Sequence, residues 1–145
     1  MFLAMRMTHA GEWERGLAIA EKALALNPIP PRLSNFTFHC YYYLRHDFER
    51  ALSYALRVQM PGFFIYHATL AADYGQLGKQ AEAKAALAEL EKVYPNFGAH
   101  AREEMRKQYW REQDVELYLD GLRKAGLEIP PKEEAPKPAA APARS

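Results

Sequence analysis

The chain has 145 residues, which suits a single domain or one stack of repeats. Its 19 basic and 18 acidic residues leave a formal charge of +1, so we expect no nucleic-acid partner, because such binders offset many phosphates with Lys and Arg. The single cysteine, Cys40, excludes an intramolecular disulfide and a thiolate metal cluster. No apolar stretch approaches the ~18 to 20 residues of a membrane span. We therefore expect a cytoplasmic protein with no membrane partner.

Prolines divide the chain into proline-free spans that are rich in Ala and Leu and poor in β-branched residues. This composition favours helix, and apolar residues recur in the spans at spacings of three and four, as on the buried face of a helix. The expected helices, in chain order, are a remnant at 1–9, one beginning near Trp13, 34–44, one beginning near Phe48, 64–77, one around Ala83, 98–108 and 112–125.

Short turns join these helices in pairs. The turns at His46-Asp47 and Gly78-Lys79 leave room only for antiparallel neighbours. Asp47 is placed to cap the helix that follows it, and Gly78 and Gly126 can adopt the left-handed conformation that ends a helix. The sequence therefore predicts an all-α fold of helical hairpins.

Three of the turns align with one another as GEWERG, HDFERA and GKQAEA. The small residues that end them, Gly16, Ala51 and Ala83, are 35 and 32 residues apart. In the first and third units a proline, Pro28 or Pro95, follows the small residue by twelve positions. This pattern resembles the tetratricopeptide repeat family, whose unit is a helical hairpin of about 34 residues.

The resemblance implies a right-handed superhelical solenoid with C-terminal capping helices. The second unit departs from the pattern, because Pro61 comes two residues early and His39 stands where a small residue is usual. The expected divisions are a repeat domain at 1–127, made of a partial repeat at 1–28, repeats at 29–61 and 62–95 and capping helices at 96–127, then a disordered Pro- and Ala-rich tail at 128–145.

In this family the first helices of the hairpins line a concave groove. The resemblance therefore implies a protein-interaction module that binds a peptide segment with apolar anchors and an acidic end. Packing against another repeat or a second copy remains the alternative role for the aromatic residues, and solvated charge the alternative for the arginines. The expected groove residues are Leu33, Phe36, Cys40, Tyr43, Ile65, Ala68, Ala72, Arg102, Arg106 and Tyr109.

Two other functions remain open. The last helix, with LRKAGL near its end, resembles the C-terminal repeat region of bacterial class III adenylate or guanylate cyclase-linked proteins, which implies a regulatory module of a larger cyclase or transcription regulator. The repeat pattern leads us to expect that the first repeat is incomplete, with the apolar residues Phe2, Leu3 and Met5 at its start. These residues make self-association as a homodimer the other alternative.

Catalytic and metal-binding patterns were not found in the sequence. The eight glycines are scattered singly and form no phosphate-binding loop, and the five histidines include no pair at metal-ligand spacing with a carboxylate between them. We read Cys40 as a lone buried thiol. We therefore expect no enzyme activity, no metal and no cofactor.

Overall fold

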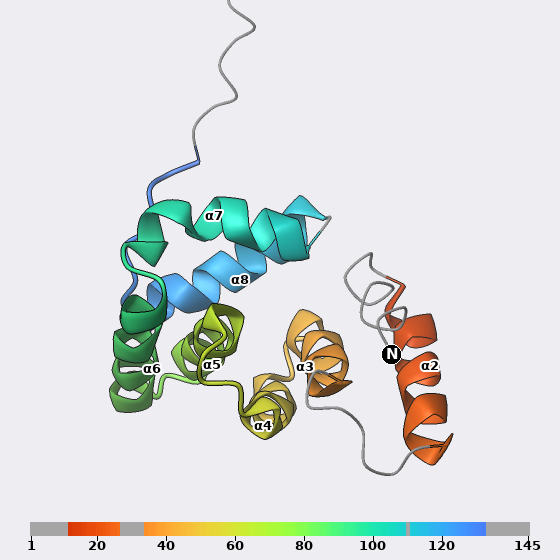
Figure 1. The fold of residues 1–145 in the computed structure, drawn as a ribbon. Helices are drawn as coiled ribbons and strands as arrows, with labels where there is room; N and C mark the ends of the chain where they lie inside the picture. Colours follow the sequence, from red (N-terminus) through yellow and green to blue (C-terminus); the bar gives the residue numbers. More distant parts are fainter. Residues whose placement is uncertain (1–11, 27–33, 110, 133–145) are drawn as a thin grey trace, which may run out of the picture.

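The computed structural model describes residues 12–26, 34–109 and 111–132. Over these ranges the chain is helical and contains no strand (Figure 1). This confirms the all-α class, whereas the expected remnant at 1–9 lies outside the described residues. The helices are α2 (Trp13–Leu26), α3 (Ser34–Leu44), α4 (Phe48–Val58), α5 (Phe64–Gln76), α6 (Gln80–Val93), α7 (Phe97–Gln108) and α8 (Glu112–Ala125).

Local sequence signals set the ends of several helices. The Asp47 carboxylate accepts a hydrogen bond from the Arg50 amide at 3.3 Å and caps α4. Gly78 and Gly126 have φ angles of 72° and 109°, which glycine adopts more easily than other residues, and they follow the ends of α5 and α8. The predicted caps and turns are confirmed at these positions.

The helices form a row of hairpins with a further pair lying across it. Helices α3 and α4 pack against each other, α5 and α6 do likewise, and α4 contacts α5 to join the two pairs. Helix α2 lies beside α3, where Ala20 and Phe38 form a small separate cluster. Helices α7 and α8 lie above α5 in the view of Figure 1.

Helix α8 packs closely along α5 rather than continuing the row beyond α6. The crossing is lined by small residues: a Cβ atom on Gly121 would lie 2.8 Å from the Ala72 carbonyl oxygen, and one on Gly75 would lie 2.7 Å from the Ala125 nitrogen. These backbones approach closely because neither glycine carries a side chain. Helix α8 therefore covers α5, and through Leu117, whose carbonyl accepts a hydrogen bond from Tyr43, it also reaches α3.

One hydrophobic cluster joins α3, α4, α5, α6, α7 and α8 into a common core. Its largest fully buried side chains include Tyr43, Phe97 and Tyr118, which come from three different helices. None of the helices that the structure describes is long and apolar enough to cross a membrane.

Candidate functional site

The predicted concave groove is not open in this structure. Phe36, Cys40, Tyr43, Ile65, Ala68, Ala72 and Tyr109 are buried, each with an exposed fraction of 7 % or less. The expectation that they line an accessible groove is wrong, because α8 packs on α5, and Tyr109 and Tyr118 contact Cys40 and Tyr43 of α3. Leu33 and the proposed self-association residues Phe2, Leu3 and Met5 lie outside the described residues.

Polar side chains cluster beneath α8 in place of a groove. His39 Nε2 lies 3.0 Å from Asp73 Oδ1, with both side chains almost completely buried. The Tyr118 hydroxyl donates a hydrogen bond to Thr69, and the Cys40 Sγ lies 3.7 Å from the Tyr109 hydroxyl. The cavity among these groups holds about 10 Å³, which is room for one water molecule and no larger ligand.

The buried pair of His39 and Asp73 has perturbed acidity. Burial alone lowers the pKa of His39, but the charge and hydrogen bond of Asp73 outweigh it and raise this pKa from 6.5 to about 10. Burial also raises the pKa of Asp73, although His39 opposes that shift. Cys40 lies next to this pair, yet a substrate has no access to its thiol through the small cavity. We therefore assign these residues to the core.

The accessible members of the predicted site are the two arginines of α7. Arg106 is half-exposed and Arg102 is mostly covered. Both line a hollow of about 320 Å³ between α7 and residues 127–132. The remaining lining residues are Gly98, Ala99, Glu103, Ile129, Pro130, Pro131 and Lys132.

Residues 127–132 reach α7 because a glycine lies opposite them. A Cβ atom on Gly98 would lie 3.3 Å from Leu127 Cδ1 and would collide with the Glu128 carbonyl oxygen. Leu127 and Ile129 pack against the core from this segment. The first part of the expected disordered tail thus lies against α7, and 133–145 falls outside the described residues.

The basic side chains of the hollow converge on Glu112, the first residue of α8. Arg106 holds this carboxylate with two hydrogen bonds, from Nε at 3.3 Å and from Nη2 at 2.9 Å. Lys132 Nζ lies 3.3 Å from Glu112 Oε1, and Arg102 Nη1 lies 3.7 Å from the same oxygen. The hydrogen bond from Arg106 is the main cause that lowers the pKa of Glu112. The carboxylate of Glu112 is therefore held by three cationic side chains, those of Arg102, Arg106 and Lys132.

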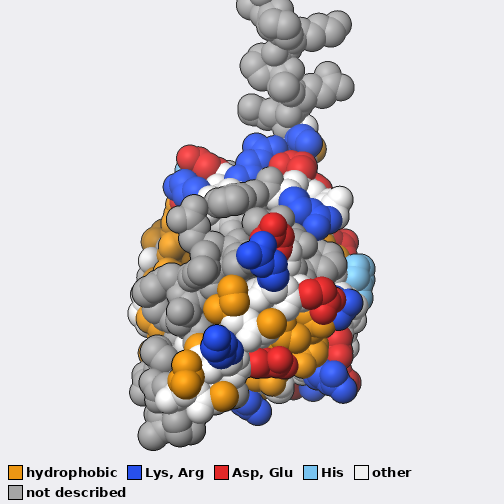
Figure 2. All heavy atoms as spheres, turned by 90° about the vertical axis from the view of Figure 1, so that its right-hand side faces the viewer, with side chains coloured by type: hydrophobic (Ala, Val, Ile, Leu, Met, Phe, Trp, Pro, Cys, Tyr) orange, Lys and Arg blue, Asp and Glu red, His pale blue; other side chains and the backbone are white. Residues whose placement is uncertain are grey.

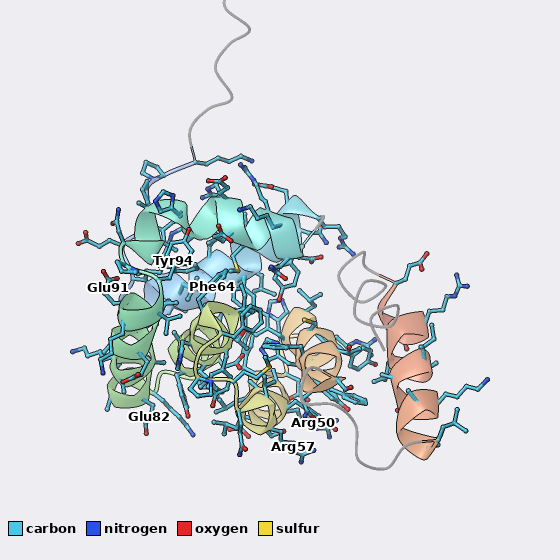
Figure 3. All side chains as sticks on the ribbon, viewed as in Figure 1. Arg50, Arg57, Phe64, Glu82, Glu91 and Tyr94 are labelled. Atoms are coloured by element: carbon cyan, nitrogen blue, oxygen red, sulfur yellow. The ribbon has the colours of Figure 1, made fainter. Side chains whose placement is uncertain are left out.

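A second hollow of about 480 Å³ adjoins the first and shares Gly98, Ala99, Ile129 and Pro130 with it. Glu91, which projects from α6 in Figure 3, and Glu128 give this side an acidic character. The segment after α8 thus borders both a basic hollow and an acidic one.

Helix α4 offers another cationic surface. Arg50 and Arg57, both labelled in Figure 3, lie over the rings of Tyr42 and Tyr54 at 5.5 and 4.8 Å. The two tyrosine rings are stacked with centroids 5.6 Å apart. On the neighbouring face that carries α2, acidic and basic side chains are interspersed (Figure 2). We favour the hollow beside α7, because its cations converge on one point.

Sequence reasoning found Arg102 and Arg106 but missed Glu112, Lys132 and the pair of His39 and Asp73. The two arginines are four apart on one helix, which is a local signal. Glu112 and Lys132 come from other segments, so only the docking of those segments brings them together. No group of three or more His, Cys, Asp or Glu side chains within the described ranges is arranged to hold a metal ion.

Comparison of the chain with protein-family models, with curated proteins and with solved structures finds no match.

Proposed function

We propose that this protein is a non-catalytic interaction module of the tetratricopeptide type, which binds a peptide segment bearing an acidic residue in the hollow beside α7. The observation that carries the proposal is that Arg102, Arg106 and Lys132, which all line the hollow, converge on the carboxylate of Glu112. Guanidinium groups bind carboxylates through paired hydrogen bonds, and arginine is enriched at protein interfaces.

The walls of the hollow suit an extended peptide. The aliphatic and ring carbons of Ile129, Pro130 and Pro131 form one side, and α7 forms the other. A peptide would therefore meet apolar contacts next to the cations, which is the combination expected for a short linear segment with an acidic anchor.

The repeat resemblance supports the module type, and the burial of the expected groove residues leads us to propose a different binding surface. The hairpins of α3 with α4 and α5 with α6 contain two of the aligned turns. Helix α8 packs on α5, and its residues Leu117 and Tyr118 contact Tyr43 of α3, on the side where this family binds peptides. We therefore place the peptide on the outer side of α7.

To test this function, peptides are selected from a random display library against the full-length protein. The affinities of the selected peptides are then measured by calorimetric titration. We expect the selected peptides to be rich in Asp and Glu. Arg106→Glu should weaken their binding about tenfold or more, because it reverses a charge at the contact point. Arg57→Glu, which makes the same change on α4, is the control and should leave affinity unchanged. Equal affinity for wild type and Arg106→Glu would refute the proposal.

A further inference from the structure

We infer that Glu112 is an internal competitor of the basic hollow, and that an acidic side chain of the bound peptide takes its place between Arg106 and Lys132. This inference rests on the proposed function. It adds the chemical group that is recognised, a carboxylate, and a means by which the chain limits its own affinity.

The geometry around Glu112 is that of a carboxylate-binding site. The Arg106 guanidinium presents Nε and Nη2 to the two carboxylate oxygens, at 3.3 and 2.9 Å, in the planar fork arrangement that matches this anion. Lys132 contributes a further cation from the segment after α8. The three groups therefore belong to three separate parts of the chain, namely α7, the start of α8 and residues 127–132.

Glu112 is held in a way that permits exchange. Its side chain is 41 % exposed, and those of Arg106 and Lys132 are 47 and 55 % exposed, so an incoming carboxylate can approach from solvent. Ion pairs with this exposure contribute little to folding, so giving up the internal pair costs little. A displaced Glu112 side chain would stay in the first turn of α8, where negative charge is favourable next to the positive end of the helix dipole.

Arg102 stays in position during such an exchange. It forms an ion pair with Glu116, one helical turn after Glu112 on α8, and its side chain is only 14 % exposed. Glu116 thus anchors Arg102 independently of Glu112. The cation cluster would keep its arrangement when the internal carboxylate leaves, which favours binding of a second one.

The chain offers a matched control for the loss of Glu112. Glu103 lines the hollow but is not the carboxylate that Arg106 and Lys132 contact. Glu112→Gln and Glu103→Gln each remove one negative charge from the surroundings of the same three cations. A difference between them reports the specific pairing rather than the overall charge of the surface.

The experiment titrates an acetylated and amidated hexaglutamate peptide into the full-length protein, with hexaglutamine and inorganic phosphate as comparison probes. We expect Glu112→Gln to bind hexaglutamate about tenfold more tightly than wild type does, since one charge-assisted pair is no longer in competition. Glu103→Gln should change the affinity by about twofold or less. Adding Arg106→Gln to Glu112→Gln should abolish the gain.

A spectroscopic measurement on the wild-type chain gives a second readout. Saturating hexaglutamate should move the carboxyl ¹³C resonance of Glu112 toward that of a free glutamate side chain, and hexaglutamine should not move it. The inference is overturned if Glu112 does not respond, if the two Glu→Gln variants gain equally, or if phosphate binds Glu112→Gln as tightly as hexaglutamate does. If the selected peptides bind through Arg106 but Glu112→Gln does not increase their affinity, this inference is refuted and the proposed function stands. If the wild-type protein binds none of the peptides, the proposed function is refuted as well.

Discussion

The ion pair of His39 and Asp73 joins α3 to α5 inside the core. Its nitrogen and oxygen lie 3.0 Å apart, and the side chains are 1 and 0 % exposed. Two charges removed from water in this way need each other, because each alone would carry an uncompensated desolvation cost. The pair therefore specifies how α3 and α5 meet more than it adds net stability.

Replacing one member of this pair should be far worse than replacing both. We expect Asp73→Leu or His39→Leu to lower the free energy of unfolding by about 3 to 5 kcal/mol, because each leaves one buried partner without its counter-charge. The variant with both substitutions should lose much less unfolding free energy than the sum of the losses of the two single variants. Chemical denaturation of the four proteins gives the coupling energy directly, and additive losses would show that the two groups do not interact.

The same pair makes stability depend on pH. The folded state raises the pKa of His39 from 6.5 to about 10, so the stabilisation from its charged form is complete below pH 6.5 and is lost as the pH rises through about 10. The raised pKa of Asp73 acts with the same sign at lower pH, because the folded carboxyl group binds its proton more firmly than the unfolded one.

Unfolding free energies of wild type should therefore decline between pH 6.5 and pH 10. The variant that carries both His39→Leu and Asp73→Leu lacks the titrating groups and should decline less over this interval. Parallel curves for the two proteins would mean that His39 is not held protonated by Asp73.

At the scale of helices, the crossing of α5 and α8 depends on glycine. A Cβ atom on Gly121 would lie 2.5 Å from the Tyr43 hydroxyl and 2.8 Å from the Ala72 carbonyl oxygen. The second neighbour is backbone and cannot rotate away, so Gly121→Ala should push the two helices apart. We expect a loss of about 1 to 3 kcal/mol in unfolding free energy from this overpacking, although alanine favours helix by about 1 kcal/mol.

Gly62→Ala is the matched control for this change. A Cβ atom on Gly62 would have no heavy atom within 4 Å, so the variant should be as stable as wild type or slightly more stable. Thermal or chemical unfolding of Gly62→Ala, Gly121→Ala and wild type measures the difference in stability. A stable Gly121→Ala protein would show that α5 and α8 are not in close backbone contact.

The boundaries of the helices could be predicted from the sequence better than the packing of one helix on another. The boundaries of α3 and α8 agree with the expected 34–44 and 112–125, because capping residues, glycines and apolar spacing act locally. The packing of α8 on α5 was not predicted. A glycine inside a predicted helix, here Gly121, indicates that another backbone packs closely against it. The sequence does not indicate which helix that is.

For the whole molecule, the shared core predicts cooperative opening. Amide protons of α3, α5 and α8 should exchange with solvent together, since their buried side chains belong to one cluster. Those of α2 should exchange earlier, because its described contacts with the rest of the chain centre on the small cluster of Ala20 and Phe38. Hydrogen exchange monitored by mass spectrometry tests this order. Exchange of α8 ahead of α5 would show that α8 opens independently.

The amino-acid sequence was sufficient to predict the all-α class, the helical segments and the turns that pair α3 with α4 and α5 with α6, because propensity, capping and short connections are local properties. It also identified Arg102 and Arg106 as a basic feature of one helix. The packing of α8 on α5 was not predictable in this way; it accompanies the burial of the expected groove residues and the contacts of the arginines and Lys132 with Glu112. The reason is physical: contacts between distant segments depend on how whole helix faces fit together, and local sequence patterns do not encode that fit.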